Sequence, residues 1–115
     1  MNSVVIHIDT DDSVRLMKAF FSAKNLLGAY KDDGIQIVFI ANGDGVKLFT
    51  KDRENSLKDE MLSLYNKGVK FMVSQNALRE THVGLDNVLE FVKIVPSGIV
   101  EMVSLSKAGY QYIKA

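Results

Sequence analysis

Three polar residues, Ser74, Gln75 and Asn76, directly follow a mostly apolar run at residues 69–73. Such a run is typical of a buried strand. In an open α/β sheet, ligands bind beyond the carboxyl ends of the strands, so hydroxyl and amide groups at this point are candidates for contacting a ligand. The same side chains also suit a plain capping role at the end of the strand, and the sequence leaves both interpretations open.

Asp9, Asp11 and Ser13 follow another apolar run at residues 3–8, with a spacing that resembles the nucleophile motif of haloacid-dehalogenase-type phosphatases. In that chemistry the first carboxylate attacks phosphorus while Mg²⁺ neutralises charge. However, the late acidic pair that would hold the metal is missing, so helix capping is the simpler interpretation. We expect no catalytic residue, metal or cofactor here, and keep Asp9 as a candidate for a ligand site.

Asn42 and Gly43 follow the apolar run at residues 35–41 and begin a turn that resembles a dinucleotide fingerprint without its third glycine. A tight turn is the first interpretation, and backbone N–H groups offered to an anion are the second. His7 lies within an apolar strand, as a core histidine would. His82 lies in an irregular segment and is either a ligand contact or a solvated loop residue, and the spacing of the two histidines matches no metal site.

Length and charge exclude several functions. The 115 residues form one domain, and 14 basic residues balance 14 acidic ones, so no nucleic-acid-binding surface is expected. There is no cysteine, which excludes disulfides, metal–thiolate sites and thiol nucleophiles. No apolar run approaches the ~18 residues that a membrane helix needs, and no signal peptide is visible, so we expect a cytoplasmic protein.

Apolar runs and helical patterns alternate along the chain. The expected strands are residues 3–8, 35–41, 69–73, 91–95 and 110–114. One expected helix begins after the capping residues Asp11 to Ser13. Two others span residues 55–67 and 99–107, and shorter helical turns are expected near 46–49 and 77–80. The first helix is predicted to bury Val14, Met17, Phe20 or Phe21, and Leu27. This alternation predicts an α/β fold, a three-layer α/β/α domain with a five-stranded, mainly parallel sheet.

The helix at residues 99–107 is apolar on nearly every side. An outer helix of a three-layer domain normally keeps one polar face, so this helix should be covered by something. Another subunit is the first expectation, which predicts a homo-oligomer. The alternative is that the segment at residues 77–90 covers it.

Three motifs in series resemble the DsrE/DsrF-like family of small α/β proteins associated with sulfur relay. They are the turn at residues 42–46, the segment from Gly68 through Ser74 to Leu78, and the tail at residues 95–101 and 109–114. The resemblance spans the whole chain. It implies a flavodoxin/Rossmann-like topology and assembly into homotrimers or homohexamers.

Many members of that family carry a cysteine where this chain has Ser74. Sulfur carriers form a persulfide on a cysteine, and a hydroxyl cannot do so because its pKa is far too high to give a soft anion. We therefore expect a non-catalytic oligomer whose binding partner is a small anion, a nucleotide or a protein of sulfur metabolism. The alternative is that the chain is a structural subunit of a sulfur-metabolism complex. The expected ligand-binding residues are Asn42, Gly43, Ser74, Gln75, Asn76, Asp9 and His82, with Ser97 and Gly98 in second place.

Overall fold

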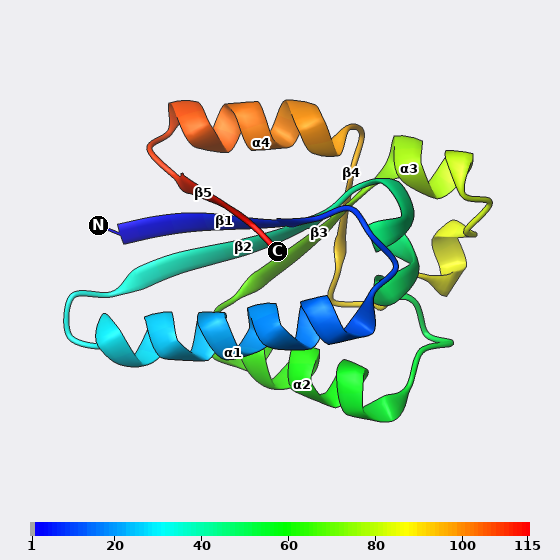
Figure 1. Cartoon of the computed structure of the whole chain (residues 1–115). Helices are drawn as coiled ribbons and strands as arrows, with labels where there is room; N and C mark the ends of the chain where they lie inside the picture. Colours follow the sequence, from blue (N-terminus) through cyan, green and yellow to red (C-terminus); the bar gives the residue numbers. More distant parts are fainter. Residues whose placement is uncertain (1) are drawn as a thin grey trace.

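A twisted sheet of five parallel strands, in the order β4-β3-β2-β1-β5, forms the centre of the computed structural model, which describes residues 2–115 (Figure 1). The strands are β1 (Asn2–Ile8), β2 (Ile35–Ala41), β3 (Lys70–Ser74), β4 (Lys93–Val95) and β5 (Gln111–Lys114). The all-parallel sheet confirms the predicted α/β fold. The order places the last strand beside the first.

Helices cover both faces of the sheet unequally. Helices α1 (Ser13–Ala29) and α2 (Asn55–Asn66) lie on one face, and α4 (Gly98–Lys107) lies on the other (Figure 1). Short helices occupy the loops: η1 (Gly43–Phe49), α3 (Gln75–Glu80) and η2 (Leu85–Asn87). Within residues 2–115, no helix is long and apolar enough to cross a membrane.

The larger core lies between the sheet and helices α1 and α2. Its centre is an aromatic cluster in which the ring centroids of Phe20 and Phe39 are 5.5 Å apart and those of Phe39 and Phe71 are 5.2 Å apart. The core on the opposite face is smaller, because α4 alone covers it among the described helices. That core consists of Val5, Val38, Ile40, Met72, Val95 and Met102.

Helix α1 buries Phe20 as predicted and packs Met17 and Leu27 partly against the core, but the rest of its buried face differs from the prediction. Leu16, Phe20 and two alanines are buried, whereas Val14 and Phe21 are 62% and 58% exposed. The buried positions 16, 19, 20 and 23 follow a helical repeat, and the alanines at 19 and 23 let the helix approach the strands closely. The prediction was wrong for Val14 and omitted Leu16 and the two alanines, because it favoured a different set of large side chains over this alanine-containing stripe.

Helix α4 buries Met102 but exposes Ile99, Val100 and Val103 by 59%, 66% and 51%. The alternative that residues 77–90 cover this surface is wrong, because α3 packs mainly against η1 and leaves the outer side of α4 open. An uncovered apolar helix surface therefore remains on the single chain.

Candidate functional site

Four polar side chains at the carboxyl edge of the sheet act as helix caps, and three of them, Asn42, Ser74 and Ser97, are residues that sequence reasoning selected as site candidates. Each side-chain oxygen accepts a backbone N–H at the start of the following helix, at 3.0–3.3 Å. The pairs are Asp12 with Val14 and Arg15, Asn42 with Gly43, Ser74 with Ala77, and Ser97 with Val100. Capping satisfies N–H groups that have no partner within the helix.

Ser74 and Asn42 come together around Gly98, the first residue of α4. A Cβ atom at Gly98 would lie 3.2 Å from the Cβ of Ser74 and 3.4 Å from the Cγ of Asn42. The glycine thus lets α4 begin directly against both loops. As a result Ser74 is only 1% exposed, and its hydroxyl is closed off from a ligand in the single chain.

Other predicted residues at this edge are more accessible. Gln75 is half-buried, and Asn76 is exposed while its backbone N–H donates to the carbonyl of Pro96 at 3.3 Å. Gly43 adopts a φ of 50°, in the left-handed region, close to the backbone of Asp9. His82 follows the C-terminal end of α3, the end opposite Ser74, so the structure does not bring these two residues together.

Strand order changes direction between β1 and β5, and the ends of these strands form the topological switch point where open α/β sheets commonly bind ligands. The Nζ of Lys114 lies 2.6 Å from the Oδ2 of Asp9 there. A hydrogen bond from Lys114 lowers the pKa of Asp9, so the carboxylate stays charged. Sequence reasoning selected Asp9 but missed Lys114, because strand order was not predicted.

His7 lies beside this ion pair. Its Nδ1 is 2.8 Å from the hydroxyl of Tyr112 on β5, and the residue is 8% exposed. Burial, followed by the positive charge of Lys114, lowers the pKa of His7, although Asp9 opposes the shift. The expectation of a core histidine bonded to a neighbour is confirmed.

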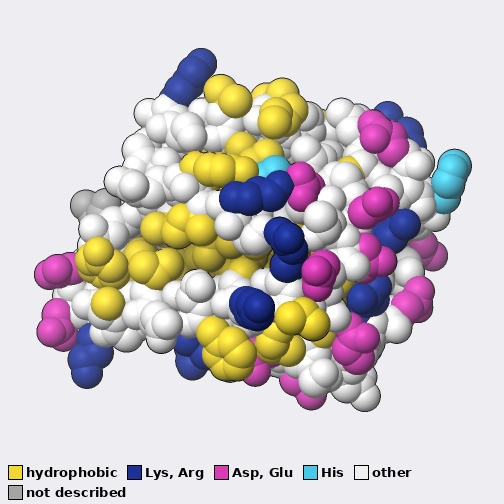
Figure 2. Space-filling view, in the orientation of Figure 1, with side chains coloured by type: hydrophobic (Ala, Val, Ile, Leu, Met, Phe, Trp, Pro, Cys, Tyr) yellow, Lys and Arg dark blue, Asp and Glu magenta, His cyan; other side chains and the backbone are white. Residues whose placement is uncertain are grey.

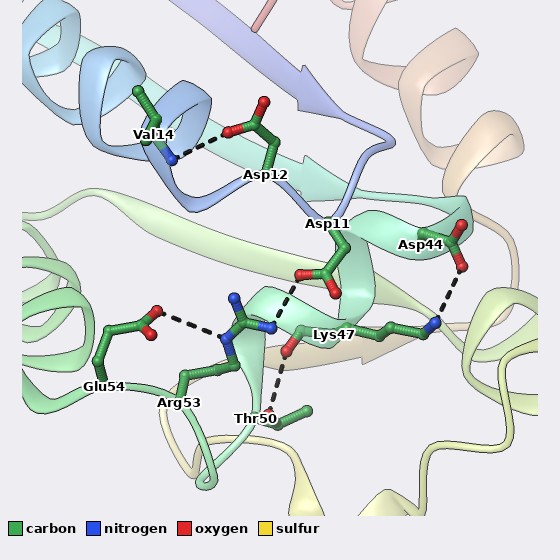
Figure 3. A network of polar contacts seen from close by, with 8 residues as sticks. All are labelled: Asp11, Asp12, Val14, Asp44, Lys47, Thr50, Arg53 and Glu54. Atoms are coloured by element: carbon green, nitrogen blue, oxygen red, sulfur yellow. Dashed lines mark hydrogen bonds and ion pairs between the residues drawn. The ribbon is translucent and has the colours of Figure 1, made fainter.

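The acidic residues of the phosphatase-like motif are both paired with cations. Asp9 is held by Lys114, and the Oδ1 of Asp11 lies 2.8 Å from Nη1 of Arg53, which also contacts Glu54 (Figure 3). In the part of the chain that the structure describes, no group of three or more His, Cys, Asp or Glu residues is arranged to hold a metal ion. The geometry therefore lacks the carboxylate set on which metal-assisted phosphoryl transfer depends.

A sequence model of the DsrE/DsrF-like family matches residues 3–115. Among solved structures, the chain is similar to MTH1491, a protein of unknown function from Methanobacterium thermoautotrophicum, with 30% identity, full coverage of both chains and a TM-score of 0.90. The ychN protein from E. coli is 12% identical with full coverage of both chains and a TM-score of 0.80. BT1422 from Bacteroides thetaiotaomicron is 17% identical, with 99% of this chain and 95% of that chain covered and a TM-score of 0.74. These last two show the fold alone. No curated protein matches the chain.

Proposed function

The chain belongs to the DsrE/DsrF-like family, and from that premise we propose that it is a self-associating, non-catalytic member that binds a small anion, a nucleotide or a partner protein. It does not carry persulfide sulfur, because the chain contains no cysteine. Ser74 stands at the start of a helix, where backbone N–H groups would favour a thiolate, yet its oxygen serves as a cap. We therefore propose a role in binding and assembly rather than in covalent sulfur transfer.

The exposed outer surface of α4 is the observation that carries this proposal. Ile99, Val100 and Val103 line a shallow cavity of about 310 Å³ together with Ser104 and Lys107. Removing these side chains from water is favourable by about 25 cal/mol per Å² of apolar surface. A second copy of the chain is the proposed occupant, because α4 is apolar on its outward side along much of its length and packs on the smaller of the two cores.

Substitution of Val100 by glutamate tests self-association. We expect the unmodified chain to have the mass of a trimer or hexamer in light scattering, and Val100→Glu to shift it to a monomer. Val14→Glu is the matched control, because Val14 is a valine near the start of α1 with 62% exposure against 66% for Val100. Glutamate meets the same helix-start environment at both positions. A monomeric unmodified chain, or equal masses for both variants, would contradict the proposal.

The accessible part of the carboxyl edge is the proposed binding site. It comprises Asp9, the Asn42–Gly43 turn, Gln75 and Asn76, with Ser74 holding α3 in place behind them. Hydrogen exchange distinguishes a binding edge from an edge filled by a neighbouring subunit. If the edge is open for a ligand, residues 75 and 76 exchange equally fast in the oligomer and in the Val100→Glu monomer. Slower exchange in the oligomer alone would instead support a structural subunit.

A further inference from the structure

We propose that the open edge of β5 is a docking strand for an extended acidic segment of another protein. Strand β5 ends the sheet, and all four of its residues are exposed. The N–H of Ala115, just beyond the strand, donates to the carbonyl of His7 at 2.8 Å. Because successive residues of a strand point their backbone groups to opposite sides, Tyr112 and Lys114 direct theirs toward the open edge. An incoming strand would pair with these two residues.

Grooves border β5 on both faces of the sheet. On the α4 side, Tyr112, Ile99, Met102 and Val103 are among the residues that line a groove of about 320 Å³. On the α1 side, Ile113 lines a groove of about 210 Å³ whose other lining residues include Ile6 and Ala19. Because side chains of an added strand point alternately to the two faces, one set would enter each groove. The edge therefore offers both backbone partners and side-chain pockets.

Cationic side chains are among the residues that line both grooves. Arg15, Lys18 and Lys114 line the groove on the α1 side, Lys107 lines the groove on the α4 side, and no acidic residue lines either. Arg15 and Lys114 are paired with Asp12 and Asp9, whereas neither Lys18 nor Lys107 takes part in an ion pair between described residues. Figure 2 shows hydrophobic side chains gathered between the helical layers with Lys and Arg side chains beside them, and Asp and Glu side chains next to some of these cations.

This charge favours an acidic partner over a second copy. The whole chain has zero net charge, so the excess of cations that Lys18 and Lys107 give this edge is local. Pairing two β5 edges would bring both sets of cations together, which is unfavourable, whereas acidic side chains on an incoming strand would meet them with complementary charge. The groove on the α1 side and the backbone of β5 are separate from the self-association surface of α4, whereas Ile99, Val103 and Lys107 line both the α4 cavity and the groove on the α4 side.

A synthetic fluorescent peptide of sequence Glu-Asp-Val-Tyr-Val-Thr-Asp-Glu tests this surface. We expect saturable binding by fluorescence anisotropy that weakens as salt is raised, with NMR shifts concentrated at the amides of Tyr112 and Lys114. A peptide with lysine in place of the acidic residues, and one N-methylated at alternate residues, should bind at least about tenfold more weakly, because they lose charge complementarity and backbone pairing respectively.

Charge reversal on the protein completes the test. The double variant Lys18→Glu and Lys107→Glu should weaken binding of the acidic peptide by at least about tenfold. The matched control is Lys31→Glu and Lys67→Glu, which changes two exposed lysines that line neither groove and should bind normally. Absence of binding, equal binding of the lysine or N-methylated peptide, or equal loss in the control pair would overturn the proposal. So would protection of the β5 amides from exchange in the oligomer but not in Val100→Glu without peptide, since a second copy would then occupy the edge.

Discussion

The imidazole of His7 and the hydroxyl of Tyr112, 2.8 Å apart, join the first strand of the chain to the last. Within the described residues, the other ring nitrogen of His7, Nε2, is buried without a hydrogen-bond partner. The pKa of His7 is lowered by burial and by Lys114. The imidazole is therefore held in its neutral form, and Tyr112 supplies its one polar contact.

Loss of the Tyr112 hydroxyl should destabilise the fold. Tyr112→Phe leaves Nδ1 of a largely buried histidine unpaired, and we expect the free energy of unfolding to fall by about 1–2 kcal/mol. Urea denaturation at pH 7.5 and one fixed protein concentration measures this, since assembly also contributes to stability. Tyr30→Phe removes a hydroxyl from an exposed tyrosine and is the control. Equal effects of the two variants would refute a role for the contact.

Stability should depend on pH through His7. The pKa of His7 in the folded chain lies below its ordinary value of 6.5, so the unfolded chain binds the proton more readily. The free energy of unfolding should therefore fall as pH drops below about 6.5, by at most about 1.4 kcal/mol per pH unit, and level off below the folded-state pKa.

Urea titrations between pH 7.5 and 5 measure this slope. His7→Gln should flatten it, and His82→Gln, which changes an exposed histidine, should not. Asp9 acts in a separate window, because its pKa is lowered from 3.8 and its contribution is lost only as pH falls below that value. A slope that persists in His7→Gln would assign the effect to another group.

Two glycine-to-alanine substitutions should change stability in opposite directions. At Gly45 a Cβ atom would lie 2.4 Å from the carbonyl oxygen of Ile8, so Gly45→Ala forces the backbone apart and should cost about 2–3 kcal/mol. Gly28 lies within α1 with no atom near its would-be Cβ, so Gly28→Ala should stabilise by about 0.5–1 kcal/mol. Thermal unfolding of both variants checks the pair, and a shared sign would contradict it.

Removing the cap at Ser74 should weaken the edge. Ser74→Ala leaves the N–H of Ala77 without its partner, which costs about 1 kcal/mol of stability. Denaturation by urea measures the loss. A change close to zero would mean that the N–H of Ala77 finds another partner.

A cysteine in place of Ser74 reports on access to the carboxyl edge. Position 74 is 1% exposed, whereas position 76 is exposed. Iodoacetamide should therefore react more slowly with the thiol of Ser74→Cys than with that of Asn76→Cys. Mass spectrometry follows both reactions in the folded protein. Similar rates would show that the edge opens and that Ser74 reaches solvent.

Sequence patterns were sufficient for the sheet because β1, β2 and β3 are β-branched or aromatic runs buried on both faces. Strand β4 is shorter than the predicted 91–95, because the chain turns just before it, where the N–H of Val92 donates to the carbonyl of Leu89 at 3.0 Å. The buried stripe of α1 was predicted at Phe20 but its alanines were missed, because alanine carries little hydrophobic signal. These errors concern packing partners, which a single sequence does not specify.

Residue type predicted the capping groups well, but not what lies beside them. Serine and asparagine at strand ends are expected caps, whereas the convergence of Ser74 and Asn42 on Gly98 depends on how closely α4 approaches the loops. The Asp9–Lys114 pair was missed for a related reason, since it requires knowing that β5 lies beside β1. Contacts between segments distant in sequence are the part of the site that local patterns leave undetermined.

The pairing of β1 with β5 has a kinetic consequence. His7 and Tyr112 are 105 positions apart, so the pairing of β5 with β1 is a contact of high sequence separation, and such contacts slow folding. Until that step, β1 presents a bare row of N–H and C=O groups to its surroundings. A folding intermediate that lacks β5 would thus be the species most prone to aggregate, and refolding yield should fall steeply as protein concentration rises.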